Sequence, residues 1–381
     1  ENIGSKCVQF ARSIDCTVEN VRVTNGTTTG GGEAYAVRIA TSNDCVVKNV
    51  YGANIRHVVD LTEASRNVVQ DCVGHENQAT DFLTHFNNCI GNAFYDCESY
   101  SNDRSAYSFT ASQGDEDNIV LGGKIVSSSV SRPNQLSTTL GNNRFIGVYI
   151  ENSDPSPNAY AVIASAWFQN CDFVLAGANC FHDGLAPIKV VMTGGSISNG
   201  SGNQSMGNLD NSTTGTSLEF SNVVFNLQNN YRTFVSENAK KSIIFRDCFF
   251  RHIDTTATTS STICYGDWAS EFYSCSSSGT SYRAGYSLNT GNTLKALDCS
   301  MPSLTGGWVS RDTGANAITL TIDRRSLQDA TTGNPVASPT IQEPRSAFVS
   351  ATTLGTVNGK VAVYNESGAL QGYFPVYDGI S

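Results

Sequence analysis

The chain has 381 residues and a formal net charge of -10, and only 15% of its residues are Asp, Glu, Lys or Arg. Such a chain can bury a long core, and its acidic balance disfavours the basic surface that nucleic acid requires. No apolar run reaches the length of a membrane span, so neither nucleic acid nor membrane insertion is expected.

A turn-forming residue followed by a small apolar one recurs along the chain. Neighbouring positions lie between 22 residues apart (Asn49 to Asp71) and 29 residues apart (Asn20 to Asn49). The turn positions are Asn20, Asn49, Asp71, Asp96, Gly122, Gly147, Asn170, Gly194, Asn222, Asp247, Ser274 and Asp298. These residue types accept tight or left-handed backbone. A loose but persistent period of this kind predicts a solenoid.

The stretches around these turns predict strands. CTVENVRV, CVVKNVYG, NAFYDCES, RFIGVYIE and IIFRDCFF alternate apolar with polar residues and are rich in Val, Ile, Phe and Tyr. That alternation is typical of half-buried strands, and no segment carries a sustained helical stripe. We therefore expect an all-β fold, a right-handed single-stranded parallel β-helix of about twelve rungs over residues 1–301. The first rung lacks a cap, from which we expect a preceding segment.

The rhythm changes after Met301. Residues 302–345 contain one strand-like run, AITLTIDR, and a Pro-punctuated stretch, and we interpret them as a connector that packs on the rod or on a partner chain. Residues 346–381 predict two strands joined by a turn at residues 365–368. A hairpin this small has no core of its own, so we expect it to be a trimerisation element that packs on copies of itself.

Twelve cysteines are present, and half of them follow turn positions: Cys72, Cys97, Cys171, Cys248, Cys275 and Cys299. A small apolar side chain in that column stacks on its own kind inside the coil. We therefore predict free, buried, structural thiols and assembly in a reducing cytoplasm. No spacing of Cys or His resembles a metal site, and we expect neither metal nor cofactor.

Rungs of this kind, the word Arg56-His57, the word Thr84-His85 and the terminal GYFPVYD together resemble the tailspikes of tailed bacteriophages, of the capsule-depolymerase kind. The resemblance implies a pectate-lyase-like parallel β-helix that forms a homotrimer and cleaves a bacterial capsular or other surface polysaccharide. It also implies a virion tail protein, attached through the missing N-terminal segment, assembled in the host cytoplasm and acting at the bacterial cell surface.

The residues two and four places after each turn should point outward on one face. The first column then runs through Tyr51, Glu98, Lys124, Tyr149 and Asp172, and the second through His75, Tyr100 and Glu151. Aromatic rings beside carboxylates and cations suit a glycan-binding groove.

Charges also gather at the following bend, in three successive rungs: Arg56, His57 and Asp60, then Glu76 and Asp81, then Asp103 and Arg104. Glycoside hydrolysis needs two carboxyl groups. We predict Glu98 as one, with Glu76 or Asp60 as the other. The expected substrate-binding residues are Tyr51, Arg56, His57, His75, Asp81, Tyr100, Asp103, Arg104, Lys124, Tyr149, Glu151 and Asp172.

Alternatives stay open for this site. Glu151 and Asp172, on adjacent rungs, form a rival carboxylate pair. The acids could instead form ion pairs between rungs, such as Arg56 with Asp60 or Glu63 with His85. A polysaccharide lyase, with Lys124 beside Tyr149 and Tyr100, and an adhesin without catalysis are the other functions considered.

Overall fold

The computed structural model describes residues 7–26, 34–77, 80–82, 88–101, 107–109, 115–127, 142–153, 160–162, 165–175, 179–183, 187–199, 206–209, 214–227, 232–252, 262–279, 283–287, 292–302, 304, 308–311, 319–323, 325–326, 340–341, 357–364 and 370–377. It divides into two units, Glu1–Ile341 and Gln342–Ser381.

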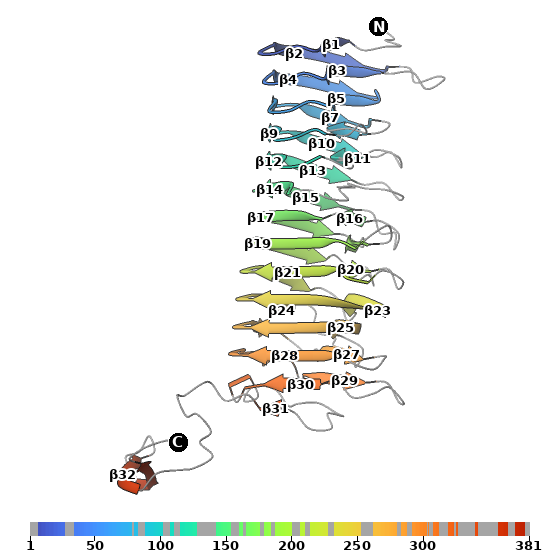
Figure 1. Cartoon of the computed structure of the whole chain (residues 1–381). Coiled ribbons are helices and arrows are strands. Elements are labelled where there is room, and N and C mark those ends of the chain that lie inside the picture. Colours follow the sequence, from blue (N-terminus) through green and yellow to red (C-terminus); the bar gives the residue numbers. More distant parts are fainter. Residues whose placement is uncertain are drawn as a thin grey trace. The chain divides into compact units, whose positions relative to one another are not determined.

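The first unit is a parallel β-solenoid whose strands stack along one axis (Figure 1). It has about eight turns, so the fold class is confirmed while the number of turns differs slightly from the expected twelve rungs. The strand register nevertheless passes through the expected turn positions in order, from β2 to β26.

Three faces run along the solenoid, and we name them A, B and C. Face A, before the turn positions, consists of the first parts of β2 (Thr17–Thr24), β4 (Val46–Ala53), β17 (Ala166–Leu175) and β19 (Lys189–Asn199), the last parts of β23 (Arg232–Arg246) and β25 (Thr262–Tyr273), and β6 (Val68–Gln70), β9 (Ala93–Tyr95), β12 (Ile119–Leu121), β14 (Arg144–Ile146), β21 (Ser217–Ser221), β28 (Thr293–Leu297), β30 (Thr319–Ile322) and β31 (Thr340–Ile341).

Face B, after the turn positions, consists of the last parts of β2, β4, β17 and β19, with β7 (Val73–His75), β10 (Glu98–Ser101), β13 (Lys124–Ser127), β15 (Tyr149–Asn152), β22 (Val224–Leu227), β24 (Phe249–His252) and β26 (Ser276–Ser278). Face C consists of β1 (Val8–Ala11), β3 (Tyr35–Ala40), β5 (His57–Thr62), β8 (Thr80–Phe82) and β11 (Tyr107–Phe109), then β16 (Tyr160–Val162), β18 (Asn179–Phe181), β20 (Gly207–Asn208), the first parts of β23 and β25, β27 (Arg283–Ser287) and β29 (Val309–Arg311).

Faces A and B meet at the turn positions, and all twelve of these residues have a positive φ, from 47° at Asp96 to 70° at Gly194. One left-handed residue per rung bends the chain while leaving it extended on both sides. Asn, Asp and Gly adopt this conformation at the lowest cost. The residue types that recur at the turn positions are therefore those that tolerate a left-handed backbone.

The core is a continuous column of apolar side chains. Ring contacts with centroid distances of 4.8 to 6.1 Å lead from Phe82 to Trp308 through Phe109, Phe145, Phe168, Phe173, Phe181, Phe220, Phe245 and Phe272. The cysteines after the turn positions are buried against this core, and all twelve cysteines are free thiols.

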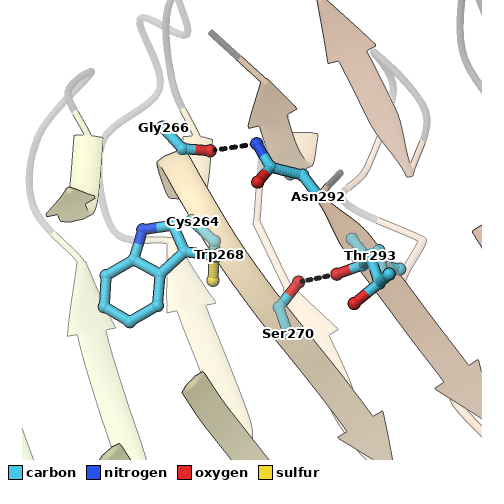
Figure 2. Close-up of a pocket in the computed structure, with 8 residues that line it drawn as sticks. Cys264, Gly266, Trp268, Ser270, Asn292 and Thr293 are labelled. Atoms are coloured by element: carbon cyan, nitrogen blue, oxygen red, sulfur yellow. Dashed lines mark hydrogen bonds between the residues drawn. The ribbon is translucent and has the colours of Figure 1, made fainter. Parts of the chain in front are cut away.

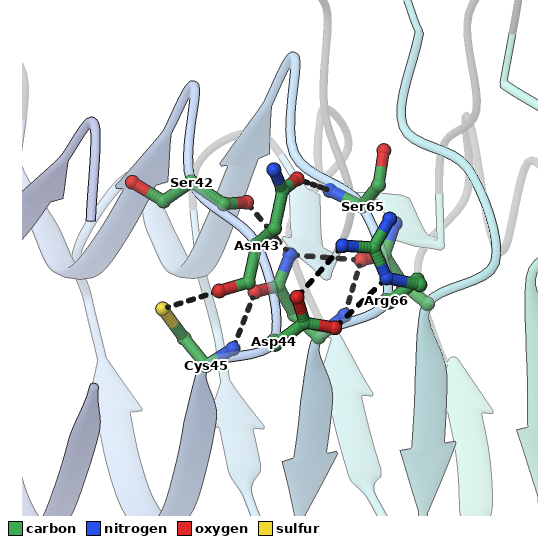
Figure 3. A network of polar contacts seen from close by, with 8 residues as sticks. Ser42, Asn43, Asp44, Cys45, Ser65 and Arg66 are labelled. Atoms are coloured by element: carbon green, nitrogen blue, oxygen red, sulfur yellow. Dashed lines mark hydrogen bonds and ion pairs between the residues drawn. The ribbon is translucent and has the colours of Figure 1, made fainter. Parts of the chain in front are cut away.

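Polar contacts between rungs keep the coils in register at another corner. Buried Asn67, Asn92, Asn118 and Asn143 form a ladder in which each amide donates to the next Oδ1 at 2.9 to 3.0 Å. Each of these oxygens also accepts a backbone N–H from the preceding rung. Close by, Arg66 makes two hydrogen bonds to Asp44, at 2.8 and 2.7 Å (Figure 3).

Residues 302–345, expected to be a connector that packs on the rod or on a partner chain, contain three described strands. Within them, β29 pairs with β27, and β30 pairs with β28 and β31, so these strands extend the solenoid beyond residue 301. In the second unit, β32 (Val357–Tyr364) and β33 (Leu370–Tyr377) form the expected antiparallel hairpin. The turn predicted at residues 365–368 lies outside the described residues. Among the residues that the structure describes, no helix has the length and apolarity that a membrane crossing needs.

Candidate functional site on face B

The two outward columns of face B are those expected from the alternation. Glu98 lies opposite Val73 on one side and Lys124 on the other, followed by Tyr149, Asp172 and Ser196. The second column contains His75, Tyr100, Val126, Glu151 and Val174 in the same register. From Tyr51 to Asp172 there are five strand steps, about 24 Å at the usual strand spacing.

Aromatic rings and cations are in contact along the N-terminal part of face B. The guanidinium of Arg22 lies 4.5 Å from the ring centroid of Tyr51. The rings of His75 and Tyr100 are 5.8 Å apart. Arg22 was not among the expected site residues, although the same alternation places it next to Tyr51.

Glu98 is half-buried and accepts a 2.7 Å hydrogen bond from the hydroxyl of Tyr100. This hydrogen bond is the largest cause that raises the pKa of Tyr100 to about 12. Tyr100 thus stays protonated at neutral pH and acts as a donor. Glu98 has Lys124 as its neighbour on the next rung but no carboxylate opposite it.

Tyr149 lies at the centre of a second group of polar side chains. Its hydroxyl donates a 3.0 Å hydrogen bond to Glu151, and the ammonium of Lys124 lies 5.1 Å from its ring centroid. Burial, this hydrogen bond and the charges of Glu151 and Asp172 all raise the pKa of Tyr149. Both carboxylates are therefore near one tyrosine, and Ser196 donates a 2.7 Å hydrogen bond to Asp172.

The carboxylate pairs differ in spacing. Glu151 lies opposite Val174, two residues from Asp172, which puts the two Cα atoms about 8 Å apart. Glu76 lies three residues beyond Val73, the partner of Glu98, so these Cα atoms are about 11 Å apart along an extended strand. Glu76 also has a φ of 53° and has left face B. The rival pair is the closer one.

Three of the residues that were expected to act on or bind substrate at the charged bend are buried. His57, Asp60 and Asp81 are 0%, 3% and 1% exposed. The chain has already entered β5 at His57 and β8 at Thr80, so these side chains belong to strands of face C and not to a bend. Asp103, Arg104, Thr84 and His85 lie outside the described residues.

The buried residues have partners inside the fold. Asp60 pairs with Arg38 at 3.2 Å, not with Arg56 as the alternative interpretation expected. The ring of His57 stacks on Tyr35 at 4.9 Å, and half-buried Arg56 lies 5.9 Å from the same tyrosine ring. Asp60 is therefore unsuited to be the second catalytic carboxyl group.

Asp81 fills a space that Gly74 leaves open, because a Cβ at Gly74 would meet its carboxyl group. Ser99 and Asn77 donate hydrogen bonds to Asp81. Complete burial nevertheless raises the pKa of Asp81 to about 7. The carboxyl group of Asp81 lies beneath face B and is not accessible to a substrate there.

The pocket drawn in Figure 2 lies elsewhere in the solenoid. Its lining includes Cys264, Trp268 and Ser270 of β25, Thr293 at the start of β28 and the preceding Asn292. None of the expected site residues lines it. Among the described residues, no three His, Cys, Asp or Glu side chains are grouped as a metal site requires.

No protein-family model matches the chain, and searches of curated proteins and of solved structures return no match. Any functional interpretation therefore depends on the fold and the surface of this chain. A parallel β-solenoid with this surface is compatible with a protein that binds or degrades a polysaccharide.

Proposed function

We propose that this protein is an endo-acting glycoside hydrolase that binds a bacterial surface polysaccharide along face B. The observation that carries the proposal is the position of Tyr149 between Lys124, Glu151 and Asp172. Flat aromatic rings next to charged groups suit sugar rings and their acidic substituents, and this surface continues with Tyr100 in the neighbouring column and Tyr51 in the same column.

In this proposal Glu151 and Asp172 replace Glu98 and Glu76 as the catalytic carboxyl groups. One protonates the leaving oxygen, and the other activates a water molecule. Their Cα atoms are about 8 Å apart, so the side chains can reach the roughly 6.5 to 9.5 Å between carboxyl groups at which an inverting enzyme holds a water molecule. Tyr149 positions Glu151 by donating a hydrogen bond to its carboxylate.

A lyase is the second candidate, because Lys124 next to Tyr149 could abstract a proton beside a uronate. The raised pKa of Tyr149 disfavours that residue as the base. An adhesin without catalysis would use the same aromatic face.

The resemblance to phage tailspikes supports a more specific form of the proposal. In this form the protein is a homotrimeric virion tail protein, assembled in the host cytoplasm, whose hairpin β32–β33 contributes to trimerisation. Truncation before that hairpin then lowers the trimer fraction seen by light scattering.

The function is tested by incubating the purified protein with a panel of bacterial capsular polysaccharides. The proposal predicts new reducing ends and shorter chains with one of them, without new ultraviolet absorbance. Shorter chains that absorb in the ultraviolet, from a new double bond, would instead identify a lyase. Retention of the protein on a polysaccharide column without any cleavage would identify an adhesin.

A further inference from the structure

Face B contains a pair of side chains that the proposed cleavage site does not include. Phe249 of β24 is half-buried, and the guanidinium of exposed Arg251 lies 5.7 Å from its ring centroid. Phe249 belongs to the first outward column, which continues from Asp172 through Ser196 and Val224. Arg251 belongs to the second column. This pair therefore lies on the proposed glycan-binding face, beyond Asp172.

Similar pairs recur along face B at a regular spacing. Among the described residues, the first outward column contains three rings that lie next to a cation, those of Tyr51, Tyr149 and Phe249. The register places three residues between Tyr51 and Tyr149, namely Val73, Glu98 and Lys124. It also places three between Tyr149 and Phe249, namely Asp172, Ser196 and Val224. Each interval is therefore four strand steps, about 19 Å at the usual strand spacing.

The cations of these pairs are available to a ligand. Within the described part of the chain, no ion pair is formed by any of the three, which are Arg22, Lys124 and Arg251. On face A, by contrast, Arg246 also lies over an aromatic ring but is already paired with Glu219 at 2.6 Å. An unpaired cation next to a flat ring can bind an anionic group while the ring packs on the sugar that carries this group.

The spacing of the cations corresponds to several sugar residues. One strand step is about 4.8 Å, and an extended chain of pyranose rings advances by a similar distance per residue. A polysaccharide that lies along face B therefore presents roughly one sugar residue to each strand step. Lys124 lies four steps from Arg22, and Arg251 lies five steps from Lys124. These intervals match an acidic group that recurs once in about four or five sugar residues.

We propose that the substrate is an acidic polysaccharide with one anionic group in each repeat of about four or five sugar residues, and that Phe249 and Arg251 form a subsite for this group. The proposal rests on the proposed function, because it takes face B as the glycan-binding face, and it adds the substrate class and a subsite. Phe249 lies three strand steps from Asp172, about 14 Å. The subsite therefore holds a sugar residue away from the bond that is cleaved.

The test measures binding to immobilised polysaccharides of known repeat, in a Glu98→Gln/Glu151→Gln background that removes both candidate catalytic acids. The panel contains neutral, uronate-bearing and phosphate-bearing polymers, and we expect binding to an acidic one, whose chemistry identifies the anionic group. Arg251→Gln should weaken that binding about threefold to tenfold, as the loss of an exposed charged contact does. Arg144→Gln removes an exposed arginine of face A and should leave binding unchanged.

Three outcomes would overturn the proposal. One is equal binding to a neutral polysaccharide, or a bound polymer with a charge on every sugar residue, and neither depends on the Arg251 variant. Another is a folded Arg251→Gln variant that binds as tightly as its parent. The third is an equal loss in Arg144→Gln, which would indicate an effect of net charge alone. Cleavage is scored separately with the wild-type protein, so binding through Arg251 without hydrolysis would refute the proposed activity and leave the subsite standing.

Discussion

The hydroxyl of Tyr149 donates a hydrogen bond to Glu151 across one intervening residue of β15. Residues two apart on a strand point to the same side, so a Tyr and a Glu at this spacing can pair without help from another rung. Tyr100 with Glu98 and Tyr273 with Glu271 form the same kind of pair. Among these three tyrosines, Tyr149 alone has its pKa raised by a carboxylate of the next rung, Asp172.

The proposed roles of Glu151 and Asp172, one as the acid and the other as the base that activates a water molecule, predict the stereochemistry of the reaction. Attack by that water in a single displacement inverts the anomeric centre. Proton NMR of the first products, recorded before mutarotation, should show the inverted anomer. Retention of configuration would require a closer pair, at roughly 5 to 5.5 Å, and would contradict the assignment.

Asp81 predicts how stability depends on pH. The pKa of its carboxyl group is about 7 in the fold, against a reference value of 3.8. Between these values the folded state binds more protons than the unfolded state. The contribution of Asp81 to the free energy of unfolding therefore falls as pH rises from about 4 to about 7 and is constant above that range.

Asp81→Asn removes this titration and keeps the shape of the side chain. Urea unfolding should show the variant to be more stable than the wild type at pH 8, by about 2 to 4 kcal/mol, and similar in stability at pH 4. An equal effect at both pH values would show that charge burial is not the cause.

The buried thiols predict a large difference between native and unfolded protein. In the native chain Cys7 is exposed and Cys16 half-buried, whereas the other ten cysteines are buried. Burial also raises the pKa of the Cys171 thiol to about 11. A thiol reagent should label at most two cysteines before unfolding and all twelve after it, without a reductant. Several unreactive cysteines in unfolded protein would indicate disulfides.

The asparagine ladder predicts a cost for removing one member. Asn118 accepts from the backbone and the side chain of Asn92 and donates to Asn143. Asn118→Ala leaves a buried N–H without its acceptor and should lower the free energy of unfolding by about 2 to 4 kcal/mol. Asn118→Asp keeps the acceptor but turns its other oxygen toward the carbonyl oxygens of Cys89 and Asn143, so it should cost at least as much at neutral pH and less at low pH. A loss below 0.5 kcal/mol for Asn118→Ala, on the same scale, would exclude a structural role for the ladder.

Much of the fold could be predicted from the sequence because one backbone requirement repeats. The turn positions need a residue that tolerates positive φ, and strand alternation then fixes which side chains face out. Both outward columns of face B follow from these two rules, including Glu98, Lys124 and Tyr149.

Other features could not be predicted, because they depend on corners whose lengths vary between rungs. His57, Asp60 and Asp81 were expected on a bend, but the chain forms a strand there and buries them. The fully buried pair of Asp183 and Lys241, at 2.7 Å, joins residues 58 apart in sequence. No period in the sequence brings those two residues together.

The central claim is that Glu151 and Asp172 cleave the polysaccharide, and the most direct test is the rate of reducing-end formation by four matched variants. Glu151→Gln and Asp172→Asn should each lower the rate by about 10² to 10⁴ while leaving glycan binding and fold intact. Glu98→Gln should cost less than tenfold, a smaller effect on the same scale. Glu271→Gln, which removes a similar tyrosine partner on face A, should have no effect. Loss of cleavage in Glu98→Gln, with activity retained in Glu151→Gln and Asp172→Asn, would contradict the account.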